Sequence, residues 1–306
     1  MRGTPTVATP EGRTDLRSWA RTHGMTPVLW LIVPGVVFML VFFIYPLLYG
    51  VSLSFQGKGG PLSAYREFFT DGFRNDNGSR ESIWITLELA LAASIINVAA
   101  ALPIAYRMRG LVRGKRVITA IVLVPMTLGT VFIASAMNTF LGPAGWFNRA
   151  VLVIGLVDRP VTLVGNFTGV LLSLVINGFP FAFLLMLGYG SGIDPSLEQA
   201  AAVLGASPRE RFRLIALPLL LPGLTITFCL SFILGFGVFP SATLVGNDAG
   251  PTRVISKIAY TEYSNAQYAT ASATAVIMAV IQLAVIGLVF WGRSRLYRGS
   301  TAGGKG

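Results

Sequence analysis

Six long apolar stretches constrain this chain more than any other feature of its sequence. They run over residues 27–53, 83–106, 117–140, 167–189, 219–239 and 268–291. Each is long enough to cross a bilayer, which takes about 20 mostly apolar residues in a helix. Because lipid offers backbone groups no hydrogen-bond partner, each stretch must be helical. The sequence therefore predicts an all-α integral membrane protein with six transmembrane helices.

The composition leaves no room for a folded soluble domain. Of the 306 residues 53% are hydrophobic and only 12% are charged, whereas soluble domains carry about a quarter charged residues. We therefore expect one membrane domain over residues 27–295. Residues 1–26 are polar, with prolines and scattered arginines, and are expected to form a disordered cytoplasmic segment. Residues 296–306 are expected to form a flexible cytoplasmic tail.

The positive charge is unevenly distributed between the two sides of the predicted membrane domain. Of the 24 Lys and Arg residues, 16 fall in the N-terminal segment, in the connections after the second and fourth stretches, and in the tail. Membrane proteins keep such basic segments on the cytoplasmic side, so both termini are predicted to be cytoplasmic. The net charge of +11 is thus a topology signal, and binding to nucleic acid is not expected.

The residues needed for chemistry are scarce. With Cys229 as its one cysteine and His23 as its one histidine, the chain excludes a disulfide framework, a multi-thiolate metal site and most histidine-based catalysis. The nearest approach to a phosphate-binding loop, residues 110–116, has the wrong spacing and lacks the hydroxyl ligand for magnesium. We expect no enzyme activity and no cofactor in this chain, so any ATP hydrolysis must come from another polypeptide.

The cytoplasmic connection over residues 190–218 is unusually long and reads as two short capped helices. Asp194 before Pro195 is typical of a helix start. Gly205 is suited to end this helix, because glycine tolerates a positive φ. Ser207 and Glu210 form the pattern of a capping box at the start of a second helix. These helices could have either of two roles, as a surface that docks on a partner or as an interfacial helix beneath the bundle.

A longer motif in this loop resembles that of a known family. Residues 198–205 read Glu-Gln-Ala-Ala-Ala-Val-Leu-Gly, and after nine more residues 215–218 read Ile-Ala-Leu-Pro. This pattern resembles the "EAA" loop of permease subunits of binding-protein-dependent ABC importers. Alignment on Gly205 places the acid of that motif at Gln199 and its alanines at Ala200 and Ala201, so glutamine replaces the usual glutamate next to Glu198.

The resemblance implies a type I ABC importer permease in the inner (plasma) membrane, with residues 27–295 as its membrane domain. In that family the loop docks on a dimeric ATPase, which binds the ATP and magnesium. The residues this implies for coupling are Glu198, Gln199, Ala200, Ala201, Gly205, Arg209 and Arg213. The implied partners are this ATPase, a second, homologous permease subunit, an extracytoplasmic solute-binding protein and the surrounding bilayer. For the two arginines, the plain positive-inside bias is an equal alternative.

Polar residues inside the spans are candidates for the solute pathway. Glu88 lies near the outer end of the second stretch, with Asn97 deeper in it, and Asn177 and Phe179 lie in the fourth stretch. We expect a helix break at residues 177–180, because Pro180 removes a backbone hydrogen bond. The alternative for these residues is contact between packed helices, which often uses Asn and Gln.

The solute is the least constrained property. The region over residues 244–256 resembles the polyamine and small-solute branch of the family more than the disaccharide branch, which favours a polyamine-like solute. An oligosaccharide is the alternative, because the chain also has aromatic, Asn and Gln side chains in its spans. A stand-alone secondary transporter would leave the two-helix cytoplasmic loop unexplained.

Overall fold

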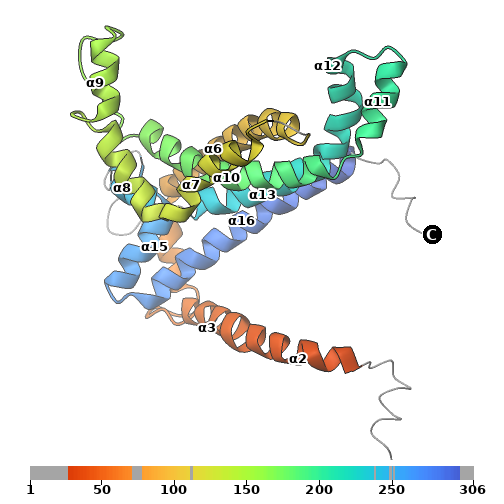
Figure 1. Cartoon of the computed structure of the whole chain (residues 1–306). Helices are drawn as coiled ribbons and strands as arrows, with labels where there is room; N and C mark the ends of the chain where they lie inside the picture. The colour runs from red at the N-terminus through yellow and green to blue at the C-terminus, as the bar shows by residue number, and fades with distance from the viewer. Residues whose placement is uncertain are drawn as a thin grey trace, which may run out of the picture. The chain divides into compact units, whose positions relative to one another are not determined.

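The computed structural model describes residues 27–70, 78–110, 113–237, 239–247, 250 and 252–296, and this part of the chain forms helices and no strand. It divides into two compact units, Met1–Ser52 and Leu53–Gly306, each of which is described by itself. Figure 1 labels the helices. The segment 1–26 and all but the first residue of the predicted tail lie outside the described residues.

One helical run fills the described part of the first unit. It consists of α2 (Pro27–Met39), the π-helical segment η1 (Leu40–Ile44) and α3 (Tyr45–Ser54), which continues into the second unit. Segment η1 ends two residues before Pro46, which has no N–H and would clash with a carbonyl of the preceding turn in a regular α-helix. The wider π turn accommodates this proline, so the first predicted span is one continuous helix.

Most of the second unit consists of long apolar helices. Those that confirm the second, fourth and sixth predicted spans are α6 (Gly78–Met108), α10 (Phe167–Ser191) and α16 (Tyr268–Leu296). The shorter helices, which the apolar stretches did not predict, are α4 (Ser63–Thr70), α9 (Trp146–Val153), α14 (Pro240–Leu244) and α15 (Ile255–Ser264).

The fifth span begins earlier than predicted. Helix α12 (Pro208–Arg211), the π segment η2 (Phe212–Ala216) and α13 (Leu217–Phe236) form one run over Pro208–Phe236. The second loop helix is therefore the first turn of the fifth span and not a separate element. Segment η2 ends two residues before Pro218, as η1 does before Pro46, so the same π turn keeps a helix continuous past a proline.

The third predicted span is not one continuous helix. It is divided into α7 (Lys115–Leu128) and α8 (Thr130–Leu141), and the chain bends there by 100°. Gly129 between them has φ 77° and ψ 155°, a backbone conformation that glycine adopts far more readily than other residues. No residue of α7 is buried, so little packing opposes the bend.

The predicted break in the fourth span is also wrong. Helix α10 continues through Pro180 from Phe167 to Ser191. Proline costs the helix one hydrogen bond and introduces a steric clash, but α10 packs against both α6 and α13, and Pro180 itself is buried. This packing keeps the segment helical.

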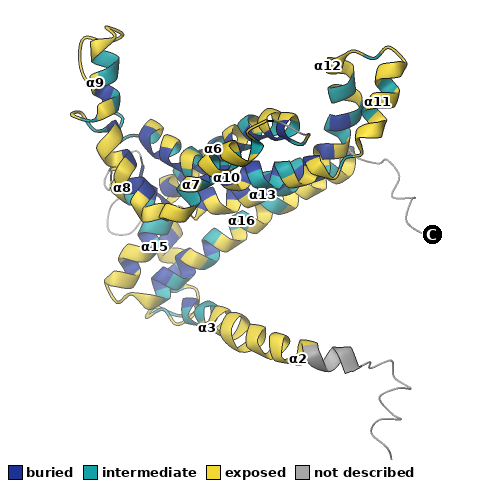
Figure 2. Ribbon diagram, in the orientation of Figure 1, coloured by how far each residue is buried: buried dark blue, intermediate teal, exposed yellow. Residues whose placement is uncertain are grey.

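Helix α6 lies at the centre of the second unit. It packs along α10 on one side and α13 on another, and buried residues of these helices are coloured dark blue in Figure 2. Small residues allow these close approaches, as is usual between membrane helices. A Cβ atom built on Gly235 of α13 would lie 3.3 Å from the Cα atom of Ala90 on α6. The central helices therefore form a tightly packed framework beneath the loop.

Candidate functional site

The loop helix α11 (Pro195–Val203) begins as the sequence predicted. The carboxylate of Asp194 accepts a hydrogen bond from the backbone N–H of Ser196 at 2.9 Å, and Pro195 occupies the first turn. This hydrogen bond lowers the pKa of Asp194 below its ordinary value. The cap thus satisfies a backbone donor at the helix start, where no donor has a partner within the helix.

The end of α11 also confirms the prediction. Gly205 has φ 88°, the left-handed conformation that favours glycine. Its N–H donates to Ala202 O, and the N–H of Ala206 donates to Ala201 O, both at 3.0 Å, which together form a Schellman motif. The capping box of Ser207 and Glu210 follows at once. Helix α11 is therefore bounded at both ends by specific backbone turns.

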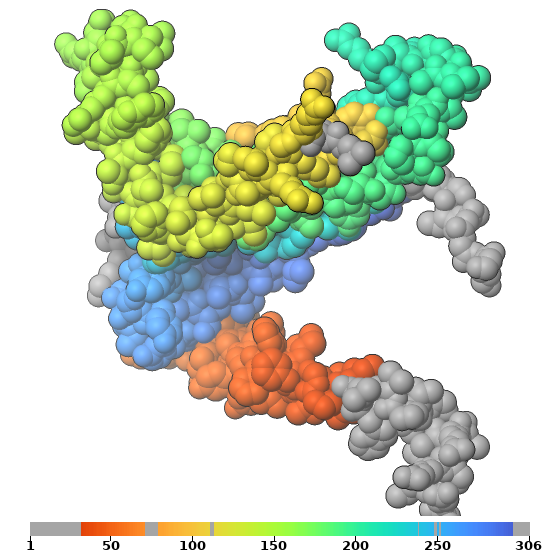
Figure 3. All heavy atoms as spheres, in the orientation of Figure 1, coloured from red at the N-terminus to blue at the C-terminus, as the bar shows by residue number. Residues whose placement is uncertain are grey.

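The tip of α11 carries exposed apolar side chains. Val203 is 89% exposed and Leu204 is 88% exposed, and Gln199 and Ala200 on the same helix are also exposed. Figure 2 shows exposed residues along α11, and in Figure 3 the loop projects from the rest of the second unit as a lobe of its own. Apolar groups gathered at an exposed tip are typical of a surface that binds another protein.

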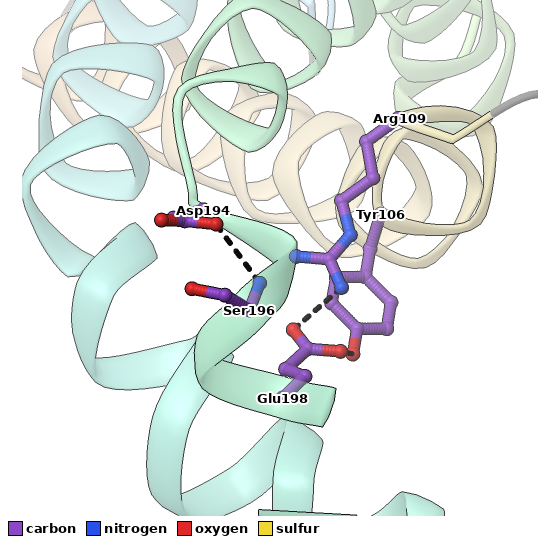
Figure 4. A network of polar contacts seen from close by, with 5 residues as sticks. All are labelled: Tyr106, Arg109, Asp194, Ser196 and Glu198. Carbon is purple, nitrogen blue, oxygen red and sulfur yellow. Dashed lines mark hydrogen bonds and ion pairs between the residues drawn. The ribbon is translucent and has the colours of Figure 1, made fainter. Parts of the chain in front are cut away.

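Glu198 does not share this exposed surface. Its Oε1 lies 2.5 Å from Nη2 of Arg109, and its Oε2 accepts a hydrogen bond from Tyr106 Oη at 3.0 Å. Figure 4 shows these side chains approaching each other from the end of α6 and from α11. The sequence pattern missed Tyr106 and Arg109, because they lie 92 and 89 positions away from Glu198.

Arg209 and Arg213 are exposed where α12 passes into η2. They line a hollow of about 880 Å³ together with Arg107 at the end of α6. One acidic residue, Glu210, also lines the hollow, and apolar side chains, among them Phe212 and Leu217, form most of the remaining wall. The hollow combines positive charge with apolar surface and therefore suits acidic or anionic groups.

In the membrane part, Asn97 is enclosed between helices. It is 1% exposed, and its Nδ2 donates to Oγ of Ser231 on α13 at 3.3 Å. A Cβ atom built on Gly178 of α10 would lie 2.5 Å from the same Nδ2. Asn97 therefore fills a three-helix junction of α6, α10 and α13, which is the alternative role considered for it.

The other three pathway candidates are more accessible. Asn177 is half-buried and has no side-chain hydrogen bond to the described part of the chain. Phe179 is also half-buried and stacks on Phe183 with a centroid distance of 6.2 Å. Glu88 is exposed on α6, on the same face as Trp84. The structure thus separates Asn97, which is enclosed, from these three side chains, which a solute or a partner can reach.

Comparisons with known proteins agree with this architecture. The family model described as "Binding-protein-dependent transport system inner membrane component" matches residues 94–296. A probable sulfate transport system permease protein of Prototheca wickerhamii is 29% identical over 67% of this chain and 79% of its own length. The spermidine/putrescine transport system permease protein PotB of Escherichia coli is 24% identical over 87% of this chain and 97% of its own.

A trehalose/maltose transport system permease protein of Thermococcus litoralis is 29% identical over 66% of this chain and 70% of its own length. Among solved structures, a bacterial alginate ABC transporter in complex with an alginate pentasaccharide-bound periplasmic protein matches with a TM-score of 0.77. The match covers 94% of this chain and 99% of that chain at 20% identity, so it shows the fold alone. The family model matches most of the length of this chain. This chain therefore belongs to the inner membrane components of binding-protein-dependent transport systems, and it is a multi-pass membrane protein.

Proposed function

We propose that this chain is the permease subunit of an ATP-driven importer and that α11 docks on a separate ATPase. The observation that carries the proposal is the uncovered apolar tip of α11, formed by Val203 and Leu204. The exposed alanine and glycine positions beside this tip allow a partner to approach closely. In this proposal ATP and magnesium are bound by the ATPase dimer and not by this chain.

The arginines of the loop supply charge next to this apolar tip. Arg209 and Arg213 are exposed and belong to the basic hollow at the end of α6. Acidic groups on the ATPase would be attracted to this side of the loop. Glu198 is excluded from the docking surface in this proposal, because its two carboxylate oxygens bind Tyr106 of α6 and Arg109 directly after α6.

The proposal includes a second, homologous permease subunit, which completes the solute pathway, and an extracytoplasmic solute-binding protein. Glu88 supports a pathway or subunit interface along α6. A carboxylate exposed on a membrane-spanning helix is costly against lipid and is normally found facing a polar cavity or another protein segment. Asn177 and Phe179 on α10 are the other side chains proposed to line this pathway.

A polyamine-like cation is the proposed solute. Glu88 supplies a negative charge, and the polyamine permease relative aligns with 87% of this chain. The relatives named for sulfate and for trehalose/maltose make these the competing solutes in a test. Uptake of labelled spermidine by cells that express the complete transporter should be lost on Glu88→Gln, with protein levels unchanged. Uptake of sulfate or a disaccharide, but not of spermidine, would refute the assignment.

Docking can be tested with a photo-reactive residue at position 203. In the assembled transporter this residue should cross-link to the ATPase. The control is the same residue at Val153, which is 87% exposed at the end of α9. Val153 lies beyond the opposite end of α10 from the loop. Cross-linking to the ATPase at position 153 but not at 203 would refute docking through α11.

Residues near the two ends of α10 also test the proposed topology, because the loop and Val153 are expected on opposite sides of the membrane. A cysteine at Arg209 should react with a membrane-impermeant reagent only from the cytoplasm, as should one at Arg113, whereas one at Val153 should react only from outside. The reverse labelling pattern would overturn the placement of the loop on the ATPase side.

A further inference from the structure

We propose that Tyr106, Arg109 and Glu198 form a polar link between the end of α6 and α11. This link transmits movement of α11, the proposed docking helix, to the membrane helices. This inference rests on the proposed docking of α11. It assigns Glu198 a positioning role within the chain, with no contact to the ATPase. We call these three residues the α6–α11 tie.

The geometry of the tie fixes both position and orientation. One carboxylate oxygen of Glu198 reaches Arg109, the residue directly after α6, at 2.5 Å, and the other reaches Tyr106 in the last turn of α6 at 3.0 Å. The Arg109 and Glu198 side chains are only 17% and 12% exposed. Water therefore screens this pair less than an exposed one, and charge-assisted hydrogen bonds of this kind are stronger than neutral ones. Two attachment points also resist rotation of α11 about its own axis.

The tie extends to a third segment through the ring of Tyr106. The guanidinium of Arg109 lies 4.2 Å from the centre of this ring. The ring also packs edge-on against Phe212 of η2, with 4.8 Å between centroids. Tyr106 thus connects the end of α6 with α11 and with the first turns of the fifth span.

Without the tie, α11 would be held by its two chain connections and by its contacts with α12 and η2, the elements that follow it in the chain. Gly192 precedes α11 and Gly205 follows it, so glycine occurs in both connections. A docking helix held by such turns and by α12 and η2 alone can tilt without moving the end of α6. With the tie, a tilt of α11 must displace the end of α6, the helix that packs against both α10 and α13.

The first test measures the tie in the permease itself. Spin labels at Val203 on α11 and Ile104 on α6, in a Cys229→Ser background, should give a narrow distance distribution. Arg109→Gln and Glu198→Gln should broaden it, and the exchange Arg109→Glu with Glu198→Arg should narrow it again. Tyr106→Phe should broaden it less, because the ring contacts remain. Arg107→Gln removes a neighbouring arginine that does not contact Glu198 and should leave the distribution unchanged.

The second test measures transmission in the complete transporter. In transporters without spin labels, Arg109→Gln and Glu198→Gln should each raise the number of ATP molecules hydrolysed per solute imported. The expected increase is at least about fivefold, which is the fold-change that corresponds to the smallest usual coupling free energy. The exchanged pair should restore the ratio, and cross-linking from position 203 to the ATPase should persist in every variant. An unbroadened distribution in the two single variants would refute the tie. A broadened distribution with an unchanged ratio would refute transmission and leave docking intact, whereas absent cross-linking in the parent protein would refute docking itself.

Discussion

The three-helix junction in the membrane and the docking helix α11 use similar residues in opposite ways. The junction brings together Asn97, Gly178 and Ser231 inside the chain, with no room left between the helices. Helix α11 also has small and amide side chains, yet Gln199 and Ala200 are exposed. Small residues let surfaces approach closely in both regions. In the junction the close approach is between helices of one subunit, whereas on α11 it is proposed to be with another protein.

Two glycines, one in the three-helix junction and one at the end of α11, show the same difference between the two regions. Gly178 has an ordinary helical backbone. Glycine is required there because a larger residue does not fit, since a Cβ atom would lie 2.5 Å from Asn97 Nδ2. Gly205 has open space around it. Glycine is favoured there because the backbone has φ 88°, which other residues adopt less readily. A larger residue should therefore fail at the two positions for different reasons, which the first two predictions separate.

The largest effect is expected at the junction. Gly178→Val should lower the free energy of unfolding by about 1–3 kcal/mol or more, because the added atoms overpack a buried three-helix contact. Thermal unfolding in detergent and the yield of folded protein measure this loss. Gly188→Val on the same helix is the control, since nothing lies within 4 Å of a Cβ atom at Gly188. Equal losses in both variants would show that space at the junction is not the cause.

The next effect is expected in the loop. Gly205→Val should leave the membrane part folded but raise the ATP hydrolysed per solute imported at least about fivefold, because a β-branched residue disfavours the turn that ends α11. Gly205→Asn should retain most of the coupling, since asparagine tolerates a positive φ better than valine. If the valine variant couples normally, the turn is not needed for docking.

Replacing the two asparagines by leucine compares an enclosed amide with an accessible one. Asn97→Leu should destabilise the fold by about 0.6–2 kcal/mol, because it removes a hydrogen bond between helices. Asn177→Leu should leave the unfolding temperature unchanged and lower the apparent affinity for solute about two- to tenfold, the value of one neutral hydrogen bond. Unfolding curves and uptake kinetics measure the two effects. Uptake by Asn177→Leu equal to that of the parent at every solute concentration would remove Asn177 from the proposed pathway.

The smallest effect is expected at the start of α11. Asp194→Ala should weaken the cap and reduce transport by less than about twofold, and Asp194→Asn should preserve it, since asparagine is an equally good cap. The backbone hydrogen bond lowers the pKa of Asp194 in the folded loop. The stabilisation is therefore present above the ordinary pKa of an aspartate and is lost as the pH falls through the lowered value. Hydrogen exchange of the α11 amides against pH should show this loss in the parent protein and not in Asp194→Ala.

Local patterns were sufficient for much of the fold and of the loop. Length and hydropathy predicted the spans that became α6, α10 and α16. The Asp194 cap, the positive φ at Gly205 and the Ser207–Glu210 capping box were predicted because each depends on residues within a few positions. Breaks were predicted less well. Pro180 was expected to interrupt α10 and does not, whereas Gly129 divides α7 from α8.

The sequence by itself determined the helical class, the number of apolar stretches and the turns that bound α11, because these follow from composition and short-range hydrogen bonds. Only the tertiary structure decided which polar residues are enclosed and which are accessible. Asn97 and Asn177 look alike in the sequence, but packing of α10 and α13 encloses the first and leaves the second half-buried. Glu198 looks like part of an exposed motif, and only the fold brings Arg109 and Tyr106 to it. Such pairings depend on how distant helices pack, which no local pattern records.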